Sequence, residues 1–208
     1  MLRRVVLTGA PGSGKTALLH ALRQRGHVVV EEAATDVIAA QQARGIDEPW
    51  QGDDFADLIV TLQRERQTAP VPSSVLVQVF DRSPLCTLAL ARYLQRPVTP
   101  SLAAEVTRVL DNRVYEQEVL LVRPLGFVEP TAARRISYQD SLAFEAVHEA
   151  TYRGHGFTLL DVPRGPVLER VAAVEAHLHT LIGSSDLVTA GRQQERSTAP
   201  RSSAGGAH

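Results

Sequence analysis

One stretch near the start of the sequence has residue types and spacing that suit phosphate binding. It matches the pattern G-x-x-x-x-G-K-[ST] at every fixed position and consists of Gly9, Ala10, Pro11, Gly12, Ser13, Gly14, Lys15 and Thr16. In such a loop the glycines let backbone N–H groups turn toward phosphate oxygens. Lys15 can reach the β- and γ-phosphates, and the Thr16 hydroxyl can ligate a metal ion. We therefore expect ATP and Mg²⁺ as cofactors, with a chance match in a ligand-free turn as the alternative.

Lys15 is the single lysine among the 22 basic residues of the chain. All the others are arginines, so the composition replaces lysine by arginine everywhere except in this loop. The planar fork of an arginine cannot take the place of a compact ammonium charge in a tight phosphate loop. The retained lysine therefore supports phosphate binding by this stretch.

Acidic residues follow two apolar runs that we predict to be strands. Asp81 comes directly after Val75–Phe80, and its carboxylate can hold Mg²⁺ together with Thr16; capping of the next helix is the alternative. Glu31 and Glu32 end another run. Because neighbouring residues on a strand point to opposite faces, we expect one of the two at the site. We favour Glu32 as the base that takes a proton from an attacking hydroxyl, with a solvated acidic pair as the alternative.

Three arginines are candidates for stabilising a transferring phosphoryl group, whose oxygens need positive charge. Arg82 directly follows Asp81. Arg134 and Arg135 lie in the stretch 126–137, a predicted loop where a lid that closes over the site would be expected. For each of the three, the alternative is an ordinary surface arginine.

The elements that must position these residues alternate between strands and helices. The strands are continuous apolar runs, which is typical of a parallel sheet covered by helices on both faces. Ligands bind such a sheet at the carboxyl ends of its strands, where the candidate carboxylates lie. We therefore predict an α/β fold with five parallel strands. Strands are expected at 2–8, 28–30, 75–80, 119–122 and 157–162, and helices at 16–25, 34–44, 53–68, 84–93, 100–113, 138–152 and 167–181.

Length and composition favour one domain with a short appendage. The chain has 208 residues, 44% of them hydrophobic, and a net charge of −1, which gives no electrostatic reason to expect a nucleic acid partner. No apolar run is long enough for a membrane span. Residues 1–182 are expected to form the domain, and 183–208, rich in Ser, Gly, Ala and Gln, a disordered tail. Without a signal-peptide pattern and with Cys86 as the single cysteine, we expect a cytoplasmic protein.

The guanine-reading element N-K-x-D cannot occur, because the single asparagine is Asn112 and the single lysine lies in the phosphate loop. This absence argues against an ordinary small GTPase. A P-loop fold of this size with a lid is instead kinase-like.

Together these motifs resemble the NadR-type AAA domain family, a P-loop group related to ribosylnicotinamide kinases. The resemblance covers about residues 1–182 and implies a P-loop kinase fold with strand order 2-3-1-4-5. The triplet Asp81-Arg82-Ser83 is also similar to the acidic-Arg-Ser motif of deoxynucleoside kinases, which implies Glu32 as the base. The resemblance rests on Val5–Thr16, Val29–Ala34 and Val79–Ser83, with further likeness at Arg134-Arg135 and Leu159–Pro163.

The residues and the resemblance lead to one leading expectation. It is an ATP-dependent phosphotransferase that acts on a small hydroxyl-bearing molecule, such as a nucleoside. Lys15, the loop amides and Mg²⁺ would hold the triphosphate. The alternative is a nucleotide-dependent ATPase or GTPase that regulates or binds a partner without small-molecule kinase activity. Acceptor pockets in such folds are built from variable helices, so the sequence names neither the acceptor nor the oligomeric state.

Overall fold

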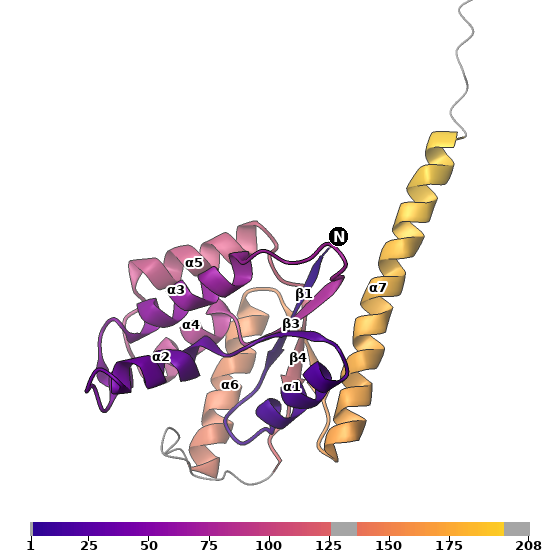
Figure 1. Cartoon of the computed structure of the whole chain (residues 1–208). Helices are drawn as coiled ribbons and strands as arrows, with labels where there is room; N and C mark the ends of the chain where they lie inside the picture. Colours follow the sequence, from indigo (N-terminus) through magenta and orange to yellow (C-terminus); the bar gives the residue numbers. More distant parts are fainter. Residues whose placement is uncertain (1, 126–136, 198–208) are drawn as a thin grey trace, which may run out of the picture.

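A parallel β-sheet forms the centre of the computed structural model, which describes residues 2–125 and 137–197 (Figure 1). Neighbouring strands pair in parallel in the order β2-β3-β1-β4-β5. The predicted five-stranded sheet and its order are therefore confirmed for the described part of the chain. The strands are β1 (Arg3–Thr8), β2 (Val28–Val30), β3 (Val77–Asp81), β4 (Glu118–Val122) and β5 (Thr158–Val162).

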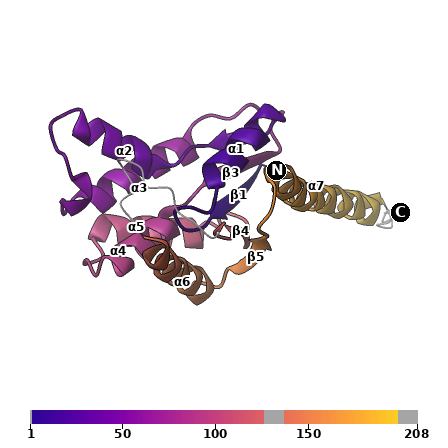
Figure 2. The same ribbon diagram turned by 90° about the horizontal axis from the view of Figure 1, so that it is seen from below.

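Both faces of the sheet carry an apolar cluster, because side chains alternate between the faces along each strand and helices pack on each face. In β1, Val5 and Leu7 join an apolar cluster on one face, whereas Val6 joins a cluster on the other. Helices α1 (Lys15–Gln24) and α7 (Val167–Ser197) cover the first face (Figure 2).

Three helices cover the second face and contribute buried side chains to its cluster. They are α4 (Pro84–Tyr93), α5 (Pro100–Asp111) and α6 (Tyr138–Gly154). Helices α2 and α3 pack outside these three through smaller apolar clusters. One cluster is shared by α3, α4 and α5, and the other by α2 and α3. These outer elements are α2 (Ala33–Gln42), the 3₁₀ turn η1 (Pro49–Gln51) and α3 (Phe55–Thr68).

Helix α7 is longer than the predicted helix, which ends at Leu181. It runs to Ser197 and projects past the rest of the molecule (Figure 1). The stretch 182–197 contains some good helix formers, such as leucine, alanine, glutamine and arginine, beside glycines and serines. The prediction ended where the apolar periodicity ends, and that periodicity indicates which residues pack on the sheet rather than how far the helix runs. The helix thus extends into the segment assigned to the tail, and the domain boundary at residue 182 stays a prediction.

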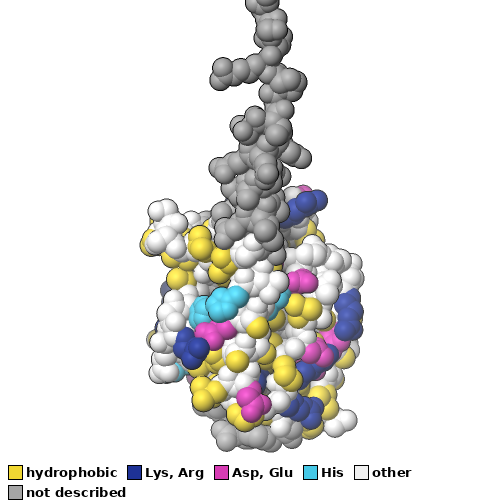
Figure 3. All heavy atoms as spheres, turned by 90° about the vertical axis from the view of Figure 1, so that its right-hand side faces the viewer, with side chains coloured by type: hydrophobic (Ala, Val, Ile, Leu, Met, Phe, Trp, Pro, Cys, Tyr) yellow, Lys and Arg dark blue, Asp and Glu magenta, His cyan; other side chains and the backbone are white. Residues whose placement is uncertain are grey.

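The face beside α7 carries charges of both signs (Figure 3). Acidic and basic side chains are interspersed there with apolar ones and with histidines, so no field of one sign covers this face. Within residues 2–125 and 137–197, no helix is long and apolar enough to cross a membrane.

Candidate active site

The phosphate-binding loop connects β1 to α1 and depends on glycine at two close contacts. Gly9 has φ of 143°, and a Cβ there would lie 2.4 Å from the carbonyl oxygen of Val122. Gly14 has φ of 75°, and a Cβ there would lie 2.7 Å from Nη1 of Arg170. L-residues with a side chain rarely adopt such backbone angles. Both the conformation and the space therefore require glycine.

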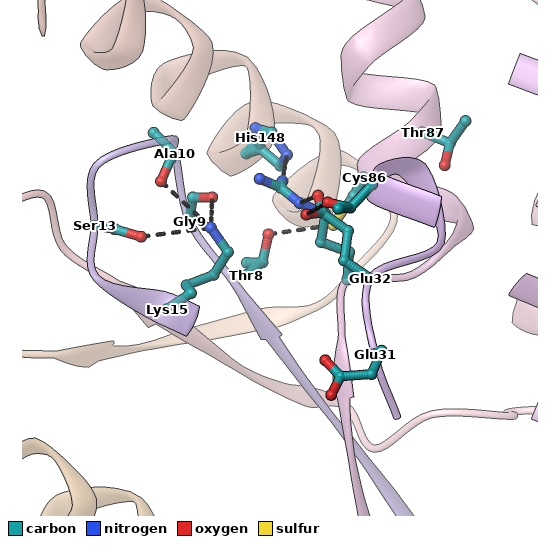
Figure 4. A network of polar contacts seen from close by, with 12 residues as sticks. Thr8, Gly9, Ala10, Ser13, Lys15, Glu31, Glu32, Cys86, Thr87 and His148 are labelled. Atoms are coloured by element: carbon teal, nitrogen blue, oxygen red, sulfur yellow. Dashed lines mark hydrogen bonds and ion pairs between the residues drawn. The ribbon is translucent and has the colours of Figure 1, made fainter. Parts of the chain in front are cut away.

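Lys15 is the first residue of α1 and its ammonium group lies inside the loop (Figure 4). Its Nζ donates to the carbonyl oxygen of Gly9 at 2.8 Å and to that of Ala10 at 3.3 Å. The Ser13 hydroxyl oxygen lies 3.5 Å from the same nitrogen. A buried cation at a helix N-terminus, surrounded by loop amides, makes a site for an anion such as a phosphate group.

A second buried cation touches this loop, and no sequence motif marks it. Arg170, on the first turns of α7, is 3% exposed and donates from Nη2 to the carbonyl oxygen of Ser13 at 2.6 Å. Burial lowers the pKa of Arg170 below its ordinary value. A single arginine among the apolar positions of a helix resembles any surface arginine in sequence, so only its distance to the loop reveals the contact.

Asp81 ends β3 and is buried beside the loop. The N-cap of the following helix is Ser83, so the alternative role of Asp81 as that cap is not the one observed. Its Oδ1 is buried without a hydrogen-bond partner among the described residues. Burial raises the pKa of Asp81, although the nearby ammonium of Lys15 opposes the change. The carboxylate is thus held where a cation would compensate its desolvation.

One cavity joins the loop to the acidic residues; we call it the phosphate-loop cavity. Its volume is about 460 Å³, and its lining includes Thr16, Glu31, Glu32 and Asp81. Hydroxyl and carboxylate oxygens are donors that Mg²⁺ prefers, and Mg²⁺ often takes few protein ligands because phosphates supply the rest. In keeping with this, no group of three or more His, Cys, Asp or Glu in the described ranges could hold a metal ion by itself. Thr16 and Asp81 therefore fit the predicted metal.

Glu31 and Glu32 point in different directions (Figure 4). Glu31 is exposed and pairs with Arg23. Glu32, the N-cap of α2, is mostly buried and accepts from Nε of Arg82 at 2.5 Å and from the Thr35 hydroxyl at 2.9 Å. The strand ends at Val30, before both residues, and the turn into α2 separates the two side chains.

Arg82 adopts an unusual backbone conformation that directs it toward Glu32. Its φ is 73°, a left-handed value that is costly for a residue with a long side chain, and its backbone N–H donates to the carbonyl oxygen of Leu7 at 3.1 Å. Its Nη1 lies 3.1 Å from Nε2 of His148. Burial lowers the pKa of Arg82 and is the largest single influence, but the charges of Glu32, Cys86 and Asp81, with the hydrogen bond to Glu32, together leave the pKa above its ordinary value.

A second cavity of about 210 Å³ also has Glu32 in its lining, together with Pro11 of the loop and Arg82; we call it the ring-lined cavity. Glu32 and Thr35 line both cavities. Two polar pairs line this second cavity: the Glu32–Arg82 pair described above, and the Thr87 hydroxyl, which donates to Oε1 of Gln63 at 3.1 Å. Its apolar lining includes Ile38, Trp50, Phe55, Ile59, Leu90 and Phe144.

The structure thus brings Lys15, Glu32, Asp81 and Arg82 to one edge of the sheet. Arg134 and Arg135 lie outside the described residues, so their part in the site stays a prediction. The sequence analysis missed two buried residues, His148 and Arg170. Each contacts a residue far away in sequence: His148 lies 66 residues from its partner Arg82, and Arg170 lies 157 residues from its partner Ser13.

Comparison with known proteins identifies the family. A family model described as an AAA domain matches residues 4–170. The chain belongs to this AAA domain family. Its resemblance to the NadR-type group is thereby confirmed, whereas the likeness of Asp81-Arg82-Ser83 to the deoxynucleoside kinase motif stays a prediction. No curated protein sequence matches the chain.

Solved structures with a similar fold include two kinds of nucleotide-binding protein. Deoxyadenosine kinase from M. mycoides with bound dCTP has a TM-score of 0.59 at 12% identity, over 85% of this AAA-domain chain and 99% of that one. NadR protein in complex with NR has a TM-score of 0.61 at 17% identity, over 84% of this chain and 48% of that one. This chain therefore spans about half the length of NadR. Identities this low show a shared fold, which agrees with the predicted P-loop kinase architecture.

Proposed function

We propose that the protein is an ATP-dependent phosphotransferase acting on a small hydroxyl-bearing molecule such as a nucleoside. The observation that carries this proposal is the position of Glu32, which borders both the phosphate-loop cavity and the ring-lined cavity. A carboxylate at that junction can accept the proton of an acceptor hydroxyl as its oxygen attacks a γ-phosphate held on the loop. A protein that only bound or hydrolysed ATP would need no second cavity beside such a carboxylate.

The loop side of the site would hold the triphosphate. The Lys15 ammonium and the backbone N–H groups of the loop from Gly12 to Thr16 suit its β- and γ-phosphates. Thr16 and Asp81 are the residues that would hold Mg²⁺. Bound Mg²⁺ neutralises charge on the phosphate oxygens. The Oδ1 of Asp81, which is buried with no hydrogen-bond partner in the described part of the chain, supports its presence.

Arg82 supplies positive charge at the junction. Its guanidinium already donates to Glu32 and has further N–H donors that can address the oxygens of a transferring phosphoryl group. Transition states of phosphoryl transfer spread negative charge over these oxygens, so a fixed cation lowers the barrier.

The ring-lined cavity would hold the acceptor. Aromatic and aliphatic side chains suit a flat ring, and the Gln63 amide offers polar atoms to its edge. The names of the fold neighbours point the same way: one is a deoxyadenosine kinase and the other, NadR, is in complex with NR. The proposal therefore names a nucleoside-like alcohol as the acceptor class.

A screen of nucleosides and ribosides for acceptor-stimulated ADP release tests the proposal. Mass spectrometry of the product would show a phosphate ester. We expect Glu32→Gln to lower kcat by about 100-fold or more while ATP affinity changes little, because the base acts on the hydroxyl and not on ATP. Glu65→Gln is the matched control, since Glu65 is an exposed residue of α3 that lines neither cavity. Undiminished turnover in Glu32→Gln, or no stimulated ADP release with any acceptor, would contradict the proposal, and the latter result would favour the regulatory alternative.

A further inference from the structure

His148 lies in the middle of α6 and is fully buried. Its two ring nitrogens have different partners. Nδ1 lies 3.0 Å from the carbonyl oxygen of Phe144, and Nε2 lies 3.1 Å from Nη1 of Arg82. A carbonyl oxygen only accepts and a guanidinium only donates. These partners assign the ring proton to Nδ1 and leave Nε2 as an acceptor.

The ring is also held in its neutral form. Burial, with the nearby charge of Arg82 adding to it, lowers the pKa of His148 to about 3. A neutral acceptor binds the guanidinium without cancelling its charge. A second carboxylate in the place of His148, in addition to Glu32, would further reduce the positive charge of Arg82 available to a phosphoryl group.

Two bonds from separate edges of the guanidinium determine its plane. Nε donates to Glu32 and Nη1 to His148, and the two acceptors come from the start of α2 and the middle of α6. With Glu32 alone, the guanidinium could rotate about a single contact. The contact with His148 removes this rotation and holds the remaining N–H donors in one direction.

We propose that His148 is a positioning residue of the phosphoryl-transfer site, a neutral acceptor that orients Arg82 against Glu32. The inference rests on the proposed phosphotransferase function. It predicts an effect on kcat rather than on ATP binding, because the orientation of Arg82 matters only to the transferring group. Loss of a group that orients a catalytic residue typically lowers activity by about 10- to 100-fold.

A purely structural role for His148 is the competing explanation. The His148 ring packs edge-on against Phe144 with 4.3 Å between centroids, and its Nδ1 bond ties it to the helix backbone. On this view any variant that keeps the packing and the Nδ1 donor would be active. The two explanations differ in which ring nitrogen matters.

Two amide variants of His148 separate these explanations. In His148→Gln the side-chain oxygen can take the place of Nε2 and accept from Arg82. In His148→Asn the shorter amide can take the place of Nδ1 and donate to the Phe144 carbonyl, but it leaves Arg82 without its acceptor. The control is His155→Asn, because His155 makes the same kind of Nδ1 contact, 2.7 Å from the carbonyl oxygen of Thr151, near the end of α6.

We expect His148→Asn to lower kcat by about 10- to 100-fold with the KM for ATP nearly unchanged. We expect His148→Gln to restore most of the rate and His155→Asn to leave it unaltered. Thermal midpoints of both His148 variants, recorded alongside, report any loss of folding. Equal losses in the two variants, or a loss confined to KM or to the thermal midpoint, would overturn the assignment.

The same substitution in an Arg82→Lys background gives a second, independent measurement. If His148 acts through Arg82, His148→Asn should change the rate of the Arg82→Lys enzyme by less than about two-fold, because coupled residues are not additive. Multiplied losses would overturn the positioning role. Failure of the proposed function is distinguishable, since the wild-type protein would then show no acceptor-stimulated ADP release with any nucleoside or riboside.

Discussion

Arg170 of α7 donates from Nη2 to the carbonyl oxygen of Ser13 at 2.6 Å, so the last helix of the fold contacts the phosphate-binding loop directly. The guanidinium is buried, and its Nε has no hydrogen-bond partner among the described residues. Few hydrogen bonds offset the cost of removing this charge from water, so Arg170 adds little to the free energy of unfolding. From its contact with the loop we predict a role in nucleotide binding.

Arg170→Met should therefore weaken ATP binding more than it changes stability. The variant removes a positive charge beside the phosphate site and the bond that holds Ser13 in the loop, so we expect ATP affinity to fall by about ten-fold or more, which is about 1.4 kcal/mol of binding free energy. The free energy of unfolding should change by less than about 1 kcal/mol, because the burial cost of the charge disappears with it. Titration calorimetry and urea unfolding measure the two quantities. Arg153→Met, at an exposed arginine of α6, is the control, and equal ATP affinities of the two variants would refute the prediction.

Gly14→Ala and Gly26→Ala form a matched pair at positive φ. Gly26 has φ of 93°, and a Cβ added there would meet nothing within 4 Å, whereas a Cβ at Gly14 would lie 2.7 Å from Nη1 of Arg170. We expect Gly26→Ala to lower the free energy of unfolding by about 1–2 kcal/mol through backbone strain alone. Gly14→Ala should cost more and should also reduce ATP affinity, because Arg170 must shift off the loop. Similar behaviour of the two variants in urea unfolding and ATP titration would show that the close contact does not matter.

Acid should destabilise the protein partly through His148. Its folded pKa of about 3 lies below the ordinary value of 6.5, so the unfolded chain binds the extra proton between these values. Stability from this group is complete above about pH 6.5 and is lost as the pH falls toward 3, at up to about 1.4 kcal/mol per pH unit. His148→Gln has no such proton to bind, so its free energy of unfolding should decline less between pH 7 and 4.5. Parallel pH curves for the two proteins in urea unfolding would rule out this contribution.

Glu175 attaches α7 to the turn after α1. It accepts from Nε and Nη2 of Arg25 at 2.7 and 2.9 Å, and Nε2 of His27 lies 2.9 Å away. Hydrogen bonds from Arg25 and then from His27 lower the pKa of Glu175 to about 2. The folded pKa is below the ordinary value of 4.5, so this stabilisation is present above that pH and disappears as the pH falls through about 2.

Glu175→Gln should accordingly lower the free energy of unfolding at pH 7 by up to about 1 kcal/mol, a small value because Arg25 is exposed to solvent. The difference from wild type should vanish near pH 2. Chemical unfolding at the two pH values measures it, with Glu169→Gln on an exposed part of the same helix as the control. A difference that persists at low pH would mean that packing, and not the ion pair, accounts for the effect.

Much of the fold was predictable because it rests on local signals. The runs that end at Thr8, Val30 and Asp81 mark strands of the parallel sheet, and glycines with a lysine and a threonine mark the loop. The predicted bounds differ from the observed ones by a few residues, except at α7. There, the helix continues to Ser197, beyond the last apolar residue that packs on the sheet.

By itself, the sequence determined the phosphate-binding loop and the parallel sheet, because both depend on backbone angles and side-chain periodicity within a few neighbouring residues. Tertiary structure alone decided which of Glu31 and Glu32 points to Arg82, since that depends on how the chain turns into α2. It also decided that His148 and Arg170 contact the site. His148 reaches Arg82 because α6 packs on one face of the sheet, and Arg170 reaches Ser13 because α7 packs on the other. No local sequence pattern predicts contacts between residues so far apart in the chain.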